Sequence, residues 1–337
     1  MGNVKIIDSH VHIRSRTDGH APLFELAERL GYTRLAVMSL QCLNPSQNTV
    51  AAALKLSKPG FVYAFGGLDY VSGRDFRTQA ENIYAMGFDG VKMLEGKPTV
   101  RRSLKMPLDS PDYDGFYSFL EEKGFPVVMH VADPDTFWDE KRAPEFAAER
   151  GWLYGADDVP YERYYAETEK LLGRYPRLRV IFAHFYFLSW DAERAQKFLD
   201  RHPNVYFDVT AGIEMYENFS LDPAFWRGFF VKNKDRIIFG TDSSDEKPSA
   251  DTVSLNGYAG MEIEFLKNDG PVEVYGMKLH GLGLPEDAQA AIFAENFLRL
   301  AGDPRTPDIA ALKKEAEYLS KYADAEQKAV LKLAEGF

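Results

Sequence analysis

The chain has 337 residues, of which 45% are hydrophobic and 14% aromatic, and this composition supplies the apolar surface of a large folded core and excludes a disordered protein. Its 40 lysines and arginines against 51 aspartates and glutamates give a formal net charge of −11, which argues against a nucleic-acid partner because phosphate binding needs a basic face. A single cysteine, Cys42, and the lack of any apolar run near the ~18 residues of a membrane helix predict a cytoplasmic protein with no membrane partner.

Short segments rich in Val, Ile and Phe alternate with longer segments of helical periodicity, a pattern typical of β-α units around a parallel sheet. The predicted strands are Val4–Ile13, Arg34–Leu40, Phe61–Asp69, Gly90–Leu94, Pro126–Ala132, Arg179–Phe185, Val205–Thr210 and Arg236–Thr241. The predicted helices between them are Pro22–Leu30, Ser46–Leu56, Asp75–Met86, Tyr113–Lys123, Tyr161–Tyr175, Asp191–Leu199 and Pro223–Val231. This order predicts an α/β fold, a (β/α)₈ TIM barrel with a C-terminal helical extension.

Two long segments interrupt the alternation. Asp133–Pro160 follows the fifth strand and would lie over the mouth of a barrel, as a lid or a dimer contact. Ser243–Leu284 follows the eighth strand, and helical patterns at Pro285–Ala301 and Pro307–Ala334 complete the chain. Because no low-complexity linker separates these parts, we expect a barrel over residues 1–302 and a helical extension over residues 303–337.

Polar residues stand where several predicted strands end. The sequence holds seven histidines, and those in or at the end of strands are His10, His12, His130 and His184. Asp242 directly follows the eighth strand. Because the carboxyl ends of barrel strands meet at the catalytic face, we expect these five side chains to converge there.

The first strand carries the pair His10 and His12. Alternation along a strand makes residues i and i+2 point the same way, so both imidazoles are expected on one face together with Asp8. The opposite face would then carry Ile7, Val11 and Ile13. Two imidazoles at this spacing can chelate a transition-metal ion, and the alternative is a pair of hydrogen-bonded core histidines. Asp208 and Thr210 share a face of the seventh strand and are candidate partners that hold a ligand histidine in one tautomer.

The sequence resembles the amidohydrolase superfamily, in the branch of metal-dependent hydrolases and decarboxylases that includes aminocarboxymuconate semialdehyde decarboxylase. The resemblance is carried by Asp8-Ser-His-Val-His, Met129-His-Val, Phe182-Ala-His-Phe, Phe239-Gly-Thr-Asp-Ser and Ile292-Phe-Ala-Glu-Asn-Phe-Leu-Arg-Leu. It covers most of the chain. One departure is Phe297, which follows Asn296 where the family usually has Ala.

The resemblance implies a role for each of these positions. His10, His12, His130 and Asp242 would bind the metal, and Asp242 would also act as a catalytic base toward water. His184 would be the second catalytic residue, which orients water or substrate, whereas in dinuclear members it binds a second ion. The implied cofactor is one divalent ion, Zn²⁺ with Mn²⁺ as the alternative. A two-metal site would need a bridging residue from the fourth strand, where Lys92 and Glu95 face opposite ways, and we expect Lys92 to line the pocket.

Positive charge near the expected mouth points to an anionic small-molecule substrate. Arg14 and Arg16 follow the first strand, and a basic loop follows the fourth strand with Lys97, Arg101, Arg102 and Lys105. Guanidinium groups there could hold a substrate carboxylate in a bidentate manner, and the alternative is a solvated basic loop. Arg14, Lys92, Arg101 and Arg102 are the candidate substrate-binding residues.

The leading functional hypothesis is metal-dependent hydrolysis of a small, carboxylate-bearing lactone, cyclic amide or ester. A divalent ion lowers the pKa of bound water from 15.7 toward about 7, which makes hydroxide available near neutrality. The alternative is a non-oxidative decarboxylase of a small aromatic or enoic acid. A second alternative is a metal-binding barrel without catalysis, and the sequence leaves open whether the chain forms a homo-oligomer.

Overall fold

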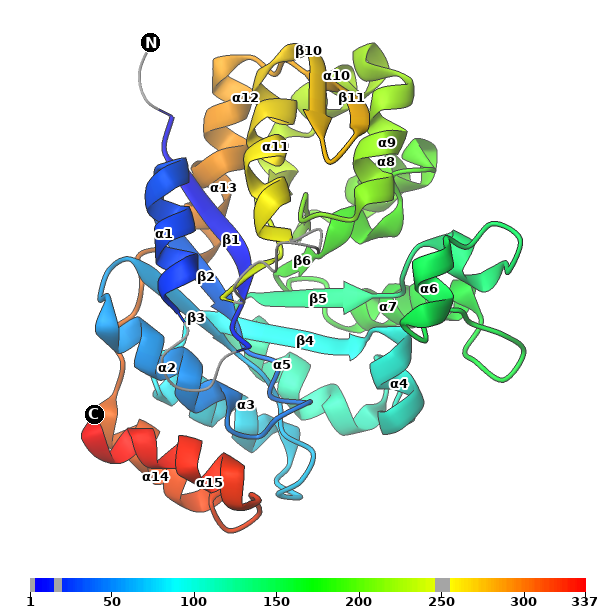
Figure 1. The fold of residues 1–337 in the computed structure, drawn as a ribbon. Coiled ribbons are helices and arrows are strands. Elements are labelled where there is room, and N and C mark those ends of the chain that lie inside the picture. The colour runs from blue at the N-terminus through cyan, green and yellow to red at the C-terminus, as the bar shows by residue number, and fades with distance from the viewer. Residues whose placement is uncertain (1–3, 15–19, 246–254) are drawn as a thin grey trace.

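A computed structural model describes residues 4–14, 20–245 and 255–337 of the chain. Its main sheet has nine parallel strands, which follow one another around the curl in the order β8-β7-β6-β5-β4-β3-β2-β1-β9. The strands are β1 (Ile6–His12), β2 (Tyr32–Met38), β3 (Val62–Gly66), β4 (Gly90–Gly96), β5 (Val127–Val131), β6 (Val180–Phe182), β7 (Val205–Asp208), β8 (Ile237–Ile238) and β9 (Ser243–Ser244). Figure 1 shows this sheet curled behind an outer ring of helices. The expected TIM-barrel fold is confirmed.

The eighth predicted strand, Arg236–Thr241, contains only β8, and a further short strand, β9, follows it outside the predicted range. β8 pairs with β7 and β9 pairs with β1, so these two strands close the sheet on itself. Between them the backbone of Ser9 donates to the carbonyl of Phe239 at 3.1 Å. Asp242 lies at the break with φ 56°, a left-handed conformation that ends regular pairing there.

The helices alternate with the strands and then continue beyond the barrel. They are α1 (Ala21–Leu30), α2 (Gln47–Ser57), α3 (Phe76–Ala85), α4 (Pro98–Leu104), α5 (Asp114–Lys123), α6 (Glu145–Glu149), α7 (Tyr161–Arg174), α8 (Ala192–Arg201), α9 (Ile213–Leu221), α10 (Pro223–Lys232), α11 (Leu255–Lys267), α12 (Glu286–Ala290), α13 (Asn296–Ala301), α14 (Ile309–Leu319) and α15 (Ala325–Leu331). An antiparallel hairpin, β10 (Asp269–Val274) with β11 (Met277–Leu282), lies within the excursion after β9. None of the helices in the described ranges is long and apolar enough to cross a membrane.

The basic segment after β4 is a helix, so the expectation of a loop there was wrong. Pro98 occupies the first turn of α4, where the missing N–H of proline has no helical acceptor to lose. Lys105 follows the helix in the left-handed conformation and donates its N–H to the carbonyl of Arg101. Two arginines expected on a loop are therefore fixed to a rigid element.

Strand β1 does not alternate regularly, which corrects the expected placement of Asp8 and Ile7. The pairing of β1 with β2 shifts register between Asp8 and Val11. Ile7 packs in one hydrophobic cluster with Ala36, whereas Val11 packs in another. An extra residue in a strand moves the side chains that precede it to the opposite face of the sheet. Asp8 therefore does not share the face of the two histidines.

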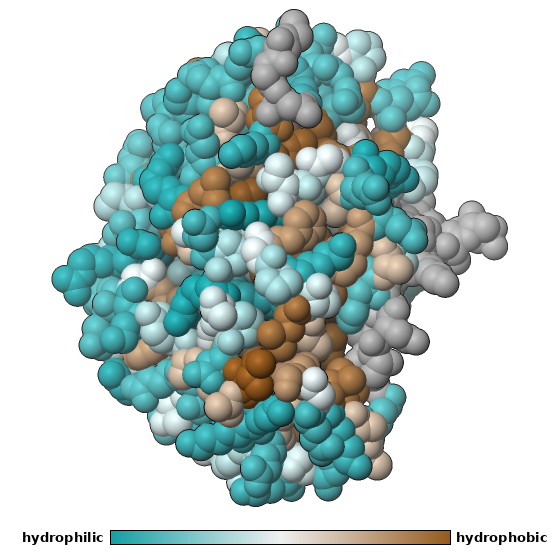
Figure 2. All heavy atoms as spheres, turned by 90° about the vertical axis from the view of Figure 1, so that its left-hand side faces the viewer, coloured by the Kyte–Doolittle hydropathy of each residue, from teal (hydrophilic) through white to brown (hydrophobic). Residues whose placement is uncertain are grey.

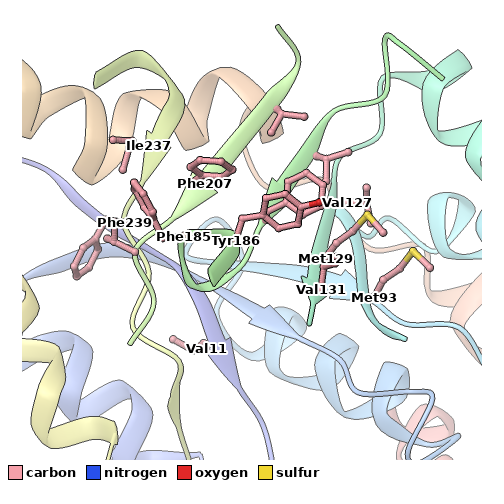
Figure 3. Close-up of a cluster of buried hydrophobic side chains, with 14 of the residues drawn as sticks. Val11, Met93, Val127, Met129, Val131, Phe185, Tyr186, Phe207, Ile237 and Phe239 are labelled. Carbon is pink, nitrogen blue, oxygen red and sulfur yellow. The ribbon is translucent and has the colours of Figure 1, made fainter. Parts of the chain in front are cut away.

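Each face of the sheet has its own core. Figure 3 shows outward side chains such as Val11, Met129, Phe207 and Phe239 in the layer between strands and helices. The inner cluster includes Ile7, Val128, Ile181, Ile238 and the ring of Phe297.

A π-helical turn, η5 (Ala291–Glu295), leads into α13 at this inner core. The Phe297 ring lies 5.0 Å from Tyr63 and 6.0 Å from Phe65, so it fills the amino-terminal end of the barrel. The C-terminal helices α14 and α15 pack on α2 and α3, at the lower left of Figure 1. The outer face drawn in Figure 2 is largely hydrophilic, with hydrophobic atoms in scattered groups.

Candidate metal centre

Three potential metal ligands come together at the carboxyl ends of β1 and β8. His10, His12 and Asp242, called the donor triplet below, offer ligand atoms that all lie within 4.8 Å of one another. The Oδ1 atom of Asp242 is 2.9 Å from Nε2 of His12 and 3.8 Å from Nε2 of His10. Two imidazole nitrogens and a carboxylate oxygen form a donor set typical of Zn²⁺ and Mn²⁺ sites.

A buried lysine lies beside the triplet. The ammonium group of Lys92, from β4, is 3.0 Å from Nε2 of His10. Burial lowers the pKa of Lys92 to about 8, although Asp242 and Asp208 oppose that shift. Burial, together with Lys92, lowers the pKa of His10 to about 4, which keeps its imidazole neutral as a ligand must be.

The Asp242 carboxylate is held in its charged form. Burial opposes ionisation, but His12 outweighs it through charge and a hydrogen bond, with further help from His184, so the pKa of Asp242 lies well below its ordinary value. The Nδ1 atom of His12 is buried and has no partner among the described residues. A carboxylate and an unpartnered imidazole nitrogen in one buried place fit a bound cation.

Backbone and side-chain acceptors on β7 fix two of the imidazoles. Nδ1 of His10 lies 2.8 Å from Oδ2 of Asp208, and Nδ1 of His184 lies 3.3 Å from the carbonyl oxygen of Thr210. Because a carbonyl or an ionised carboxylate can only accept, the proton of each neutral ring belongs on Nδ1. The lone pair of each ring is therefore on Nε2, where Lys92 contacts that of His10.

His184 reaches the pocket through an unusual turn. It begins the short helix η3 (His184–Phe187), in which all four residues have positive φ, between 50° and 57°. Non-glycine residues in this region cost ~1–3 kcal/mol each and persist where surrounding contacts fix them. The ring of Phe187 lies 5.1 Å from His184 and 5.3 Å from His130 and shields both imidazoles with an apolar surface.

His130, from β5, belongs to a second group of side chains, called the Asp133 network below. Its Nε2 atom is 3.0 Å from Oδ1 of Asp133, and that oxygen also accepts from Lys97 at 3.0 Å. Tyr154 donates its hydroxyl to the other oxygen of Asp133. Burial favours protonation of Asp133, but Lys97 and His130 outweigh it, so the pKa of Asp133 is strongly depressed.

The rings of His130 and His184 are 4.9 Å apart, so the Asp133 network borders the pocket of the donor triplet. His130 is not part of the triplet, and its Nε2 atom instead contacts Asp133. Its role as a ligand stays a prediction.

The family profile described as "Amidohydrolase" matches residues 7–300, a range that includes every residue of the triplet. The chain belongs to the amidohydrolase family. A search of curated proteins finds no significant match.

This amidohydrolase is similar in fold to several solved structures. It is similar to the 5-carboxyvanillate decarboxylase of Sphingomonas paucimobilis, with 12% identity, 89% of this chain and 99% of that chain covered, and a TM-score of 0.56. It is also similar to the 2,6-dihydroxybenzoate decarboxylase of Rhizobium, with 13% identity, 88% and 98% covered, and a TM-score of 0.55. An uncharacterised TIM-barrel protein of Bordetella bronchiseptica matches with 18% identity, 88% and 98% covered, and a TM-score of 0.53. At these identities the likeness concerns the fold alone.

Asp8 stabilises the residue that precedes Asp242. Its carboxylate accepts the hydroxyl of Thr241 at 2.6 Å and the backbone N–H of the same residue at 3.1 Å. Burial raises the pKa of Asp8 to about 7. Because Thr241 precedes Asp242, this contact fixes the backbone that presents the Asp242 carboxylate.

Lys92 and Glu95 are both buried on β4 but have different neighbours. Lys92 contacts His10, as expected for the residue that lines the pocket. Glu95 accepts the hydroxyl of Tyr70 at 2.9 Å, and burial raises the pKa of Glu95 to about 7. A register shift between Met93 and Gly96 changes the alternation of β4 at this point.

The predicted substrate-binding arginines of α4 have partners within the protein. Arg101 donates to both carboxylate oxygens of the buried Glu167, at 2.9 and 3.2 Å. Arg102 pairs with Asp158 and donates to carbonyl groups of the segment after β5. The backbone N–H of Arg14 donates to Asp245 at 2.7 Å, and Arg16 lies outside the described residues. Substrate binding by Arg14, Arg101 and Arg102 stays a prediction.

The sequence did not predict Asp133 or the contacts of the Asp133 network. The aromatic residues of the segment after β5 form a small cluster, in which Phe137 stacks on Trp152 and Trp138 contacts Tyr154. Lys97 lies over the Trp152 ring at 4.5 Å. The only sequence signal was the position of Asp133 three residues after His130, which is too common to predict a contact.

Proposed function

We propose that this protein is a metal-dependent hydrolase that acts on a small, carboxylate-bearing lactone, cyclic amide or ester. His10, His12 and Asp242 would hold the ion, with His130 as the predicted fourth ligand. A divalent ion of this kind supplies Lewis acidity, which lowers the pKa of water at the site from 15.7 toward about 7. Zn²⁺ is the expected ion, with Mn²⁺ as the alternative, and we expect one ion per chain.

The single observation that carries hydrolysis is the contact of His184 Nδ1 with the carbonyl of Thr210, at 3.3 Å. This contact leaves Nε2 of His184 as an acceptor, which can orient a water molecule by accepting one of its protons. Burial lowers the pKa of His184, so its neutral form prevails near neutral pH. A neutral acceptor suits the activation of water better than the protonation of carbon.

Asp242 would complete the reaction as the base. As the water oxygen bonds to the substrate carbonyl carbon, Asp242 accepts the proton that the water loses. The bond from that carbon to its ring oxygen or nitrogen then breaks, and Asp242 returns the proton to the leaving atom. Its depressed pKa keeps Asp242 ionised near neutral pH.

Decarboxylation is the second candidate, because one observation favours it. Lys92 is a buried cation with a pKa of about 8 beside His10, and it could pair with a substrate carboxylate or donate a proton to carbon. Two of the similar structures are named as decarboxylases, of 5-carboxyvanillate and of 2,6-dihydroxybenzoate. These names describe those proteins and make aromatic acids sensible test compounds here.

The test is a panel of lactones, cyclic amides, esters, aromatic acids and enoic acids with protein loaded with Zn²⁺ or Mn²⁺. Hydrolysis is scored as acid release and decarboxylation as release of carbon dioxide. We expect hydrolysis that Asp242→Asn abolishes and that Lys92→Met reduces by a smaller factor. Carbon dioxide release without hydrolysis would reject the proposal, and a fully loaded protein inactive on the entire panel would favour a binding role.

A further inference from the structure

Helix α11 carries one carboxyl group in an otherwise apolar buried stripe. Ala259, Glu262 and Leu266 stand at positions i, i+3 and i+7 of the helix, and all three are fully buried. The helix packs beside β9, and Leu266 belongs to the hydrophobic layer between the strands and the outer helices (Figure 1). A carboxyl group in such a place needs a partner, because an unpaired buried charge is costly.

The carboxyl group of Glu262 has no partner within the described ranges of the chain. Both of its oxygen atoms lack a hydrogen-bond partner there, and this holds for no other buried carboxyl group of these ranges. Two other buried carboxylates face a cation, since Lys55 pairs with Asp89 and Arg101 pairs with Glu167. Glu262 lacks a counter-charge of this kind among the described residues, and native proteins rarely leave a buried polar group in that state.

The groups around Glu262 supply oxygen atoms and negative charge. Burial raises the pKa of Glu262 well above its ordinary value, and Asp8, Asp242 and Asp208 raise it further. The buried hydroxyl of Tyr32 also has no hydrogen-bond partner among the described residues. Burial, Asp8 and Glu262 all raise the pKa of that hydroxyl. Glu262, Asp8 and Tyr32, called the oxygen cluster below, therefore bring acidic oxygen atoms together from α11, β1 and β2.

The spacing within the oxygen cluster suits a shared ion. Its members lie close enough for their charges to interact, yet no hydrogen bond joins Glu262 to Asp8 or to Tyr32. Oxygen ligands of a hard cation such as Ca²⁺ lie ~2.3–2.6 Å from the ion, so two ligands on one ion are farther apart than two hydrogen-bonded oxygens. Carboxylate and hydroxyl oxygens are also the ligand type that hard cations prefer.

The hydrogen bonds of Asp8 indicate the charge of that ion. The Asp8 carboxylate accepts the hydroxyl and the backbone N–H of Thr241, and it accepts the backbone N–H of His10 at 3.2 Å. Three hydrogen bonds stabilise the negative charge of Asp8 without an ion. The charge of Glu262 is then the one that remains uncompensated in the oxygen cluster, and a single positive charge balances it.

We propose that Glu262, Asp8 and Tyr32 bind a monovalent metal cation, Na⁺ or K⁺, on the outer side of the barrel wall. The ion joins helix α11 to the first two strands of the sheet. This site is separate from the donor triplet, because Asp8 does not share the face of β1 that carries the two histidines. The proposal therefore does not depend on the reaction catalysed.

Thermal unfolding of the full chain loaded with Zn²⁺ tests the site, in the chloride salts of Na⁺, K⁺ and choline at equal ionic strength. Choline is too large for a buried site of this kind and reproduces the screening of the metal salts. We expect Na⁺ or K⁺ to raise the unfolding midpoint by ~2–4 °C over choline, as for a ligand at about ten times its dissociation constant. The salt that gives the larger rise identifies the ion.

Three variants assign the effect to the oxygen cluster. Glu262→Gln keeps the size of the side chain and removes its charge, so it should abolish the difference between the salts. Tyr32→Phe removes one oxygen and should reduce that difference. Glu95→Gln is the matched control, since Glu95 is also buried but accepts the hydroxyl of Tyr70, and it should keep the full difference.

Circular dichroism shows whether each variant is folded, and Tyr32→Phe decides alone if Glu262→Gln is not. A wild type with the same unfolding midpoint in all three salts overturns the proposal and makes Glu262 a buried neutral acid. A difference between the salts that both Glu262→Gln and Tyr32→Phe retain overturns it as well, because the ion then binds elsewhere.

Discussion

The two sides of the barrel mouth differ in how fully their polar side chains are hydrogen-bonded within the chain. On the β1–β9 side, the donor triplet brings two imidazoles and a carboxylate within 4.8 Å, and Nδ1 of His12 has no partner among the described residues. On the β4–β5 side, Asp133 engages His130, Lys97 and Tyr154 at once. The first side therefore keeps a buried nitrogen without a described partner, whereas Asp133 has both its carboxylate oxygens engaged within the chain.

This difference distinguishes a group of side chains suited to bind a ligand from a group that holds structural elements in position. Buried polar atoms without partners are costly, so an arrangement that keeps them indicates a ligand. Satisfied networks instead hold their elements in place. The Asp133 network joins the end of β5, the start of α4 and the segment after β5. It therefore holds these three segments in place beside the donor triplet.

Loss of the triplet carboxylate should have the largest effect. Asp242→Asn removes the proposed base and one ligand, and we expect turnover to fall by about 10²- to 10⁴-fold. Metal content, measured by elemental analysis after dialysis, should fall as well. His130→Asn is the comparison from the other side, and we expect it to retain more metal than Asp242→Asn. Equal loss of metal in both variants would show that the two sides form one site.

The strand-end residues were predictable because topology alone places them. In a parallel barrel every strand ends at the same face, so His10, His12, His184 and Asp242 had to converge once the strands were recognised. The contact between Asp208 and His10 followed from the same reasoning, since both side chains point inward near the mouth.

The remaining features depend on tertiary structure that periodicity does not encode. Strict alternation cannot reveal the register shift in β1, so it placed Asp8 on the wrong face. Predicting the Asp133 network requires the path of the segment after β5. Side-chain contacts such as that of Tyr154 determine this path. Helix α4 was taken for a loop because seven residues rich in basic side chains show no clear apolar periodicity.

Breaking the Arg101–Glu167 pair tests whether the β4–β5 side is structural. Arg101→Met leaves the buried Glu167 without its bidentate partner, although Arg163 and the Leu108 N–H still contact it, and we expect a loss of ~1–3 kcal/mol in the free energy of unfolding. Arg102→Met is the control, since that guanidinium is 43% exposed and should contribute ~1 kcal/mol or less. Urea denaturation measures both. Unchanged stability in Arg101→Met with a raised KM would instead support the predicted role in substrate binding.

The carboxylates that contact the histidines, Asp208 and Asp133, allow a second comparison of the two sides. Asp208 fixes the tautomer of His10, so Asp208→Asn should weaken metal binding by about 10- to 100-fold. Asp133→Asn is the matched change on the other side, and we expect it to weaken metal binding less while increasing amide exchange around Tyr154. Isothermal titration with Zn²⁺ gives the affinities. The opposite order of affinities would move the ion toward β5.

The smallest effect concerns pH and uses two residues of the β4–β5 side. Burial first, and then Lys97, lowers the pKa of His130 from 6.5 to about 3, so below pH 6.5 the unfolded chain binds a proton that the folded chain refuses. Burial raises the pKa of Glu95 from 4.5 to about 7, so above pH 4.5 the folded chain keeps a proton that the unfolded chain loses. The first residue destabilises the protein as pH falls, and the second destabilises it as pH rises.

The variants His130→Gln and Glu95→Gln should therefore change stability with opposite slopes. In metal-free protein between pH 4.5 and 6.5, His130→Gln gains stability over the wild type as pH falls, by ~1.4 kcal/mol per pH unit. Glu95→Gln gains a similar amount as pH rises. Urea unfolding at several pH values measures both differences, and each refers to the wild type, so other titrating groups cancel. Slopes of the same sign would mean that one of these groups is solvated in the native state.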